Sequence, residues 1–274
     1  MSELIHLQPL VDMIALTLQT KFIKNEKNGT SLLIIARPET AKTTLACAFS
    51  NLDFVSYYDE VTQKKMIDEF LPLIRAGQKR TLIVPDLVNC IQKQKSTREQ
   101  FLNMIKTGID DTGIKQISTY HKQMQYLDLV DGLKFNMITA TTTANYIHLE
   151  KEIKDTGLLS RYAPFAFDLP INMIANIFEV LEGCPAKPAD KITIPKLYLR
   201  DMDIPNNPTL FKSFEIVSRS LGMRYGGFGF RAQTALQRLA KASAIIDKRK
   251  EVEKSDIEKV MQLCRWINYD FNPL

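Results

Sequence analysis

The chain has 274 residues, of which 45% are hydrophobic, so it can bury one large core and a smaller second domain. The formal charge is +5, and the basic residues are dispersed among 31 acidic ones. This balance is compatible with nucleic acid as a partner, but the protein is not of the strongly basic class. The four cysteines lack C-x-x-C spacing and the three histidines are far apart, which argues against a disulfide framework or a zinc site and fits a reducing compartment.

The beginning of the chain shows no signal for export or membrane insertion. No basic stretch precedes an apolar run, and the most apolar early segment, PLVDMIALTL, is interrupted by Asp12 and too short to span a bilayer. We therefore expect a cytoplasmic protein without a membrane partner.

Strand and helix signals alternate through the first two thirds of the chain, which favours an α/β fold with a parallel sheet and helices on its faces. Apolar and β-branched runs predict strands at 31–36, 53–58, 80–88, 134–143 and 163–169.

Helices are predicted between these strands. The segment 42–49 follows the first strand, and 62–77 has helical spacing with a stop at Gly77. Another helix is expected at 96–108, which opens with a capping box of Ser96 and Glu99. A hairpin is predicted between about 114 and 130.

The last third of the chain has a different character. Residues 183–208 contain five prolines and read as a linker, after which the pattern is almost wholly helical. In this part, 230–246 carries an apolar stripe, and Ser255 with Glu258 forms a second capping box. We predict a core at 1–182, the linker, and an α-helical domain at 209–274.

The stretch ARPETAKTT, residues 36–44, joins the first strand to its helix and raises the question of phosphate binding. A P-loop needs backbone N–H groups around the phosphates, a lysine for the terminal phosphates and a hydroxyl for magnesium. Lys42 and Thr43 stand where that mechanism needs them. Ala36, Glu39 and Ala41 replace glycines; alanine is tolerable wherever φ is negative, whereas a glycine needed for positive φ would be missed. The alternative is an ordinary turn with a surface lysine.

ARPETAKTT is similar to the Walker A motif of minichromosome maintenance helicases and MoxR-type ATPases, a branch of the AAA+ ATPases in which a Thr-Ala-Lys-Ser type of ending replaces Gly-Lys. The resemblance implies a parallel-sheet P-loop core followed by a small α-helical lid, with ATP and Mg²⁺ as ligands. It implies that nucleotide is bound by Ala36, Arg37, Pro38, Glu39, Thr40, Ala41, Lys42, Thr43 and Thr44.

TLIVPDL resembles the Walker B strand of that branch, with Asp86 lying 44 residues after Lys42 (86 minus 42). The resemblance implies that Thr43 and Asp86 serve the magnesium ion. Leu87 occupies the position of the glutamate that polarises water, so we expect slow turnover unless Asp110 or Asp111 supplies the base. A register shifted by one residue, or an acidic residue that merely ends a strand, remain the alternatives.

Three further positions follow from the resemblance. Thr142 best matches the sensor 1 position, with its two threonine neighbours as alternatives in a strand end that need not have any function. GLLSRYAPFAFDL resembles the LLSRF box, which makes Arg161 the arginine finger of a neighbouring subunit, the alternative being an intrachain salt bridge. Arg231 matches sensor 2 at the head of a lid helix.

These matches predict a ring-forming AAA+ ATPase that binds ATP and ADP and acts on DNA. The hairpin, which offers Lys115, His121, Lys122 and two tyrosines, matches the place where helicase relatives touch DNA. Basic plus aromatic residues suit a nucleic-acid backbone with stacked bases, so single- or double-stranded DNA is the expected partner. A solvated hairpin or a loop that contacts protein is an equal alternative. A MoxR-like remodeller of protein complexes and a non-hydrolysing ATP switch or scaffold subunit are the other functional hypotheses.

Overall fold

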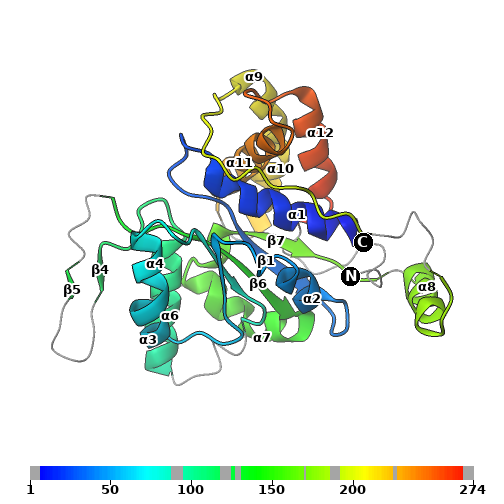
Figure 1. Ribbon diagram of the computed structural model, residues 1–274, viewed down its shortest axis with the longest axis horizontal. Helices are drawn as coiled ribbons and strands as arrows, with labels where there is room; N and C mark the ends of the chain where they lie inside the picture. Colours follow the sequence, from blue (N-terminus) through cyan, green and yellow to red (C-terminus); the bar gives the residue numbers. More distant parts are fainter. Residues whose placement is uncertain are drawn as a thin grey trace.

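The computed structural model describes residues 7–87, 95–117, 125–126, 131–169, 171–185, 192–224 and 227–267. Its centre is a sheet of five parallel strands in the order β2-β3-β6-β1-β7 (Figure 1). The strands are β1 (Ser31–Ala36), β2 (Val55–Tyr57), β3 (Thr81–Val84), β6 (Asn136–Thr142) and β7 (Tyr162–Ala166). All five coincide with predicted strands, so the prediction of a parallel sheet is confirmed.

Strand β1 lies in the middle of this arrangement. Ile34 pairs with Ala140 of β6 on one side and with Phe165 of β7 on the other, and all six residues of β1 are buried. The run LLIIA, residues 32–36, is continuously apolar because elements cover both faces of the strand. Six residues at about 3.3 Å each place the two ends of β1 about 20 Å apart.

Helices lie around the sheet as predicted, except for α8 (Ile171–Leu181), which stands away from it (Figure 1). The expected helix at 62–77 is built from α3 (Gln63–Lys65), a π-helical turn (Met66–Phe70) and α4 (Leu71–Arg75). It ends at Gly77, whose φ of 70° is readily adopted by glycine. The other helices of this part are α1 (Gln8–Gln19), α2 (Lys42–Cys47), α6 (Lys95–Gly108), α7 (Thr143–Asp155) and α8 (Ile171–Leu181).

The predicted hairpin is also confirmed. Strands β4 (Gln116–Ile117) and β5 (Gln125–Tyr126) pair antiparallel and lie at the left edge of Figure 1, apart from the main sheet. His121 and Lys122, two of the candidate DNA-contacting residues, lie outside the described residues. Lys115, just before β4, is exposed.

The last part of the chain forms a helical domain of α9 (Pro208–Phe211), α10 (Glu215–Arg224), α11 (Phe230–Ile246) and α12 (Lys254–Leu263). Helix α1 lies between this domain and the sheet and contacts α11 (Figure 1). Within the described residues, none of the helices has both the length and the apolar character needed to cross a bilayer.

The predicted linker is fastened along α1. The Gln19 side chain donates to the Tyr198 carbonyl and accepts from the Tyr198 N–H, both at 2.8 Å, and Gln8 makes a similar pair of bonds with Thr193. Side chains of α1 therefore satisfy backbone groups of this extended segment, whose Met202 also forms an isolated parallel bridge with Ile23. The division of the chain at residues 182 and 208 stays a prediction.

Both predicted capping boxes require correction. Helix α6 begins at Lys95, so Ser96 lies inside its first turn instead of before it. In α12 a capping box is present, but Glu253 and Asp256 form it in place of Ser255 and Glu258. The helix begins earlier than expected because a carboxylate can accept the free N–H groups as a hydroxyl does.

Candidate nucleotide site and arginine cluster

The loop that resembles Walker A connects the carboxyl end of β1 to the short helix α2. The Lys42 side chain turns back onto this loop, where Nζ donates to the Ala36 carbonyl at 3.0 Å, to the Arg37 carbonyl and to Thr40 Oγ1 at 3.1 Å. Thr40 Oγ1 in turn donates to the Arg37 carbonyl at 2.8 Å. The lysine ammonium is thus enclosed by oxygen atoms of the loop itself, whereas Thr43 and Thr44 are exposed at its outer side.

Two of the residues that replace glycine have a left-handed backbone. Glu39 has φ of 64° and Ala41 has φ of 59°, whereas Ala36 ends β1 as an ordinary strand residue. For a residue with a Cβ this conformation costs about 1–2 kcal/mol. The loop therefore follows a path that glycine would adopt without strain, and the sequence keeps that path at an energetic cost.

Asp86 is electrostatically close to Lys42. Burial lowers the pKa of the Lys42 ammonium, and the negative charge of Asp86 partly opposes that shift. Asp86 follows β3, two strands away from β1, and the parallel order brings it to the same edge of the sheet. The cation and carboxylate that the resemblance assigns to phosphate and magnesium are therefore neighbours.

Leu87, next to Asp86, belongs to the hydrophobic core. Its side chain is 1% exposed, and its N–H donates to the Ala140 carbonyl at 2.9 Å. A glutamate at this position would be a buried carboxylate, which is costly without a partner. A change of Leu87 to Glu alone would thus destabilise the fold instead of supplying a base.

Thr142 ends β6 and is the register partner of Ala36, so it lies beside the beginning of the loop. Its hydroxyl accepts a 3.2 Å hydrogen bond from the Asn145 N–H at the start of α7. Thr141 is buried within the sheet, and Thr143 is the first residue of α7. Among the three threonines, Thr142 therefore combines partial exposure with a position next to the loop.

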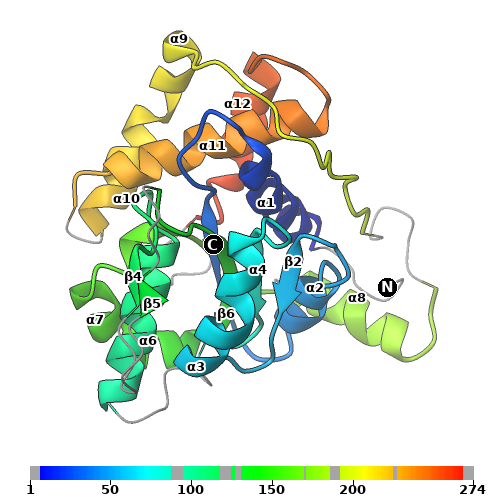
Figure 2. The same ribbon diagram turned by 60° about the vertical axis from the view of Figure 1, so that its left-hand side comes forward.

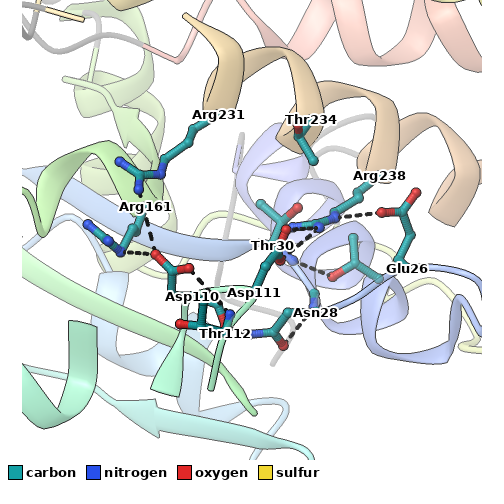
Figure 3. Close-up of polar contacts among 12 residues, drawn as sticks. Glu26, Asn28, Thr30, Asp110, Asp111, Thr112, Arg161, Arg231, Thr234 and Arg238 are labelled. Atoms are coloured by element: carbon teal, nitrogen blue, oxygen red, sulfur yellow. Dashed lines mark hydrogen bonds and ion pairs between the residues drawn. The ribbon is translucent and has the colours of Figure 1, made fainter. Parts of the chain in front are cut away.

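Arg161 and Arg231 lie at the opposite edge of the sheet, where β1 and β7 begin (Figure 3). Arg161 Nε donates to Asp110 Oδ2 at 2.5 Å, and its Nη1 donates to the Gly157 carbonyl at 2.6 Å. Arg231 Nη2 is 3.7 Å from the same Asp110 oxygen, and its Nη1 donates to Ser160 Oγ at 3.0 Å. One carboxylate thus holds two arginines in place.

The pKa of Asp110 is set by two opposing effects, burial and the neighbouring arginines. Burial by itself raises the pKa of the carboxyl group, but the charge and hydrogen bond of Arg161, the Thr112 N–H and the charge of Arg231 together lower it below its ordinary value. Asp110 is therefore an anion at neutral pH.

A second set of charges joins the helical domain to the sheet domain. Arg238 of α11 donates to Asp111 at 2.9 Å and to Glu26 at 3.0 Å (Figure 3). Lys241 donates to Glu26 at 2.6 Å. Lys241 is 1% exposed, so its charge depends on Glu26 for a partner.

These ion pairs show that Asp110 and Asp111 do not supply a base to the loop of the same chain. Both carboxylates are occupied by arginines at the edge where β1 begins, whereas Lys42 lies where β1 ends, about 20 Å away. The hollow beside them has a volume of about 100 Å³, below the roughly 300 Å³ typical of small ligand pockets.

The structure therefore divides the sequence-predicted residues into two groups. Lys42, Thr43, Asp86 and Thr142 gather at the carboxyl edge of the sheet, and Arg161 with Arg231 gathers at the amino edge. Sequence reasoning missed Asp168, which pairs with Arg37 at 2.9 Å, and the joint between Glu26 and Arg238. Nothing in the local sequence pattern signals partners so far apart in the chain.

Comparison with known proteins assigns the helical domain. Residues 219–265 match the family model described as the AAA lid domain, and this span covers the later part of α10 and all of α11 and α12. The search for similar curated proteins found no match. A lid domain after a parallel sheet with helices fits a P-loop ATPase core plus helical lid and indicates an AAA+ ATPase.

The left-handed conformation of Ala41 makes a stability prediction. Ala41→Gly should raise the free energy of unfolding by about 0.5–1 kcal/mol, because relief of strain exceeds the entropy that glycine adds to the unfolded chain. Urea denaturation measures the difference. The control is Ala48→Gly, at φ of −58°, which should lower the same free energy. Equal losses for both variants would contradict the strained loop.

Asp110 makes a prediction about pH. Asp110→Asn should lower the free energy of unfolding by about 2 kcal/mol at pH 7, because Arg161 loses a charged hydrogen-bond partner. The folded-state pKa of Asp110 lies below its ordinary 3.8, so the wild-type advantage is present above about pH 4 and is lost as pH falls through the folded-state pKa.

The measurement is urea denaturation of both proteins from pH 7 down to the lowest pH at which the wild type folds. Asp131→Asn, at an exposed carboxylate, is the matched control and should change the free energy by less than about 0.5 kcal/mol. A constant gap between wild type and Asp110→Asn across the whole range would refute the assigned pair.

Proposed function

We propose that the chain is an ATP-binding AAA+ ATPase subunit whose nucleotide sites are shared between copies in a ring. The observation that carries the proposal is the separation of Lys42 from Arg161 by the length of β1. One chain cannot present both cations to the same terminal phosphate. A second copy, turned head to tail, can supply the missing arginine.

On the nucleotide side, each residue has a role that its position allows. Lys42 would exchange contacts with loop carbonyls for contacts with phosphate oxygens, which makes stronger, charge-assisted hydrogen bonds. The exposed Thr43 hydroxyl and the Asp86 carboxylate suit magnesium, and Thr142 lies close enough to the loop to act on the terminal phosphate or its water. Bound magnesium would neutralise charge on the phosphates.

On the other side of the shared site, Arg161 would have to leave Asp110 or share it. Its guanidinium makes one bond to that carboxylate and one to the Gly157 carbonyl, and a phosphate could replace the latter. Arg231 is 54% exposed and lies at the same edge, so we propose that it too faces the nucleotide of the next copy.

Turnover in this scheme is slow. The residue after Asp86 is a core leucine, and Asp110 and Asp111 are engaged by arginines, so neither of these carboxylates of the same chain polarises water at the loop. The electrostatic contribution of Arg161 in trans would then be the larger part of the catalysis.

Single-stranded DNA is the partner that we propose for the ring. The support is the hairpin of β4 and β5, which stands apart from the sheet, and the exposed Lys115 at its base. A basic hairpin on each copy of a ring would contact a phosphate backbone at repeated positions.

The shared-site proposal is tested by mixing two variants. Lys42→Ala should weaken binding of a fluorescent ATP analogue about 10- to 100-fold, since the variant has no charged hydrogen-bond donor for the phosphate. Arg161→Ala should keep that binding and lower ATPase activity about 10³-fold. Combined, the two proteins should recover part of the activity, because some interfaces then pair an intact loop with an intact arginine.

Lys64→Ala, at an exposed lysine far from the loop in sequence, is the control for loss of a positive charge. The wild type must show measurable turnover, and both variants must fold and co-assemble. If a mixture that meets these conditions stays inactive, Arg161 acts only within its own chain and the shared site is wrong.

The DNA proposal is tested through salt. Binding of wild-type protein to a labelled single strand, followed by fluorescence anisotropy, should weaken steeply as salt rises, because phosphate contacts release counterions. Lys115→Ala should reduce the slope of log K against log salt by about 0.7 for each phosphate that the variant no longer neutralises. If the wild-type protein does not bind the labelled strand at low salt, the result would favour a protein complex as the substrate.

A further inference from the structure

Helix α8 is apolar and exposed. Its sequence, INMIANIFEVL, contains a single charged residue, and none of the 11 residues that the structure describes in it is buried. Ile171 is 87% exposed, Phe178 is 59% exposed and Leu181 is 73% exposed. Figure 1 shows α8 standing away from the sheet and from the lid. An apolar helix of this kind normally has a covering surface.

A second apolar surface is formed by the lid. The rings of Phe228 and Phe230 stack at 5.7 Å between centroids, and they are 80% and 76% exposed. Gly229 between them has φ of 85°, and a Cβ there would lie 2.0 Å from the Ser218 carbonyl oxygen. This close approach to α10 holds the turn, so that both phenylalanines project into solvent.

A hollow of about 500 Å³ lies beside these rings. Its wall includes Lys154, Gly157, Ser160 and Arg231, so the hollow adjoins the arginine cluster. We call the two phenylalanines and this hollow the Phe228–Phe230 surface.

The two apolar surfaces lie at opposite edges of the sheet. Helix α8 begins five residues after β7 ends at Ala166 (171 minus 166), at the carboxyl edge, where Arg37 of the loop pairs with Asp168. The Phe228–Phe230 surface adjoins Arg231 at the amino edge. Figure 2 shows α8 on the right of the molecule and α10 on the left. They cannot meet within one chain, but they can meet between two copies arranged head to tail.

Charge distinguishes this pairing from α8 packing on itself. The charged residues in α8 and just after it are both acidic, namely Glu179 in the helix and Glu182 at its end. The described residues that line the hollow include Lys154 and Arg231 but no acidic side chain. An α8–α8 contact would bring like charges together, whereas the Phe228–Phe230 surface offers opposite charge.

We propose that α8 of one copy docks on the Phe228–Phe230 surface of the next copy. The inference rests on the proposed function in one respect, since this docking brings the loop edge of one copy toward Arg161 and Arg231 of its neighbour. It adds the contact that positions the shared site: an apolar helix of 11 residues, anchored by Phe178, against two stacked rings.

Cross-linking tests the pairing directly. In a background with the exposed Cys184 changed to Ser, Phe178→Cys and Phe230→Cys are made as separate full-length proteins. Under mild oxidation, the mixture should give at least about ten times more covalent dimer than either protein alone, because a head-to-tail contact joins unlike positions. Leu199→Cys, at a 49% exposed apolar position outside both surfaces, should give no such dimer with either protein.

Sedimentation of the full chain with a non-hydrolysable ATP analogue measures the contribution to assembly. Phe178→Ser and Phe228→Ser should each weaken self-association about tenfold, because each removes an aromatic anchor from the interface, whereas Leu199→Ser should change it less than twofold. Circular dichroism checks that each variant folds.

Several outcomes would overturn the proposal. Abundant dimer from Phe178→Cys alone would show that α8 packs on α8, and absence of the mixed dimer from a protein that still oligomerises would place the contact elsewhere. In that second case the shared site stands if the mixed Lys42 and Arg161 variants recover activity. If the mixed dimer forms but Lys42→Ala leaves the affinity for the ATP analogue unchanged, the docking stands and the proposed function fails.

A bilayer is the remaining partner for an apolar helix. Co-sedimentation with phosphatidylcholine–phosphatidylglycerol vesicles that is abolished in Phe178→Ser, together with unchanged self-association of that variant, would assign α8 to lipid and overturn the docking. A wild type that stays monomeric at all concentrations with nucleotide would overturn both the docking and the ring.

Discussion

The parallel pairing of β1 with both β6 and β7 is the constraint on which the rest of the molecule depends. Because the five strands of this sheet run in one direction, every segment that follows one of them emerges at one edge and every segment that precedes one enters at the other. The loop with Lys42, the turn with Asp86 and the threonines after β6 follow strands. Arg161 precedes β7. The two groups are therefore kept apart by the length of β1, and no rearrangement of loops alone brings them together.

Two adjacent carboxylates, Asp110 and Asp111, have different roles between the lid and the core. Arg238 and Lys241 pair with Glu26 and Asp111, and their near-complete burial makes each dependent on its partner. The neighbouring Asp110 belongs to the same turn but holds Arg161 and attracts Arg231. The turn that fastens the lid thus also orients the arginines at the amino edge. A shift of the lid would move Arg231 relative to Asp110, so lid position and arginine orientation are coupled through two adjacent carboxylates.

Much of the fold could be predicted from the sequence, because continuous apolar runs, helical spacing and a stop at Gly77 are local signals. The contacts that organise the site are not local. The pair of Glu26 with Arg238 joins residues 212 positions apart, and the inward orientation of Leu87 depends on how β3 and β6 pair. The left-handed backbone of Glu39 and Ala41 could not be predicted from the sequence either, since neither residue type requires a positive φ. The exposure of α8 could not be predicted either, because an apolar helix has the same pattern whether its partner is its own core or another molecule.

The hydrogen bonds that Lys42 makes to its own loop affect how much binding energy the loop would gain from a phosphate. The ammonium has three protons, and it makes three contacts with oxygens of its own loop. A phosphate that approaches does not meet a bare cation, so it gains only the difference between a charge-assisted bond and a bond to a carbonyl or hydroxyl. In return, these contacts hold the strained turn at Glu39 and Ala41 in place before any ligand arrives. The loop is therefore held in its strained path by its own lysine, and a phosphate that replaced these contacts would have to compensate for their loss.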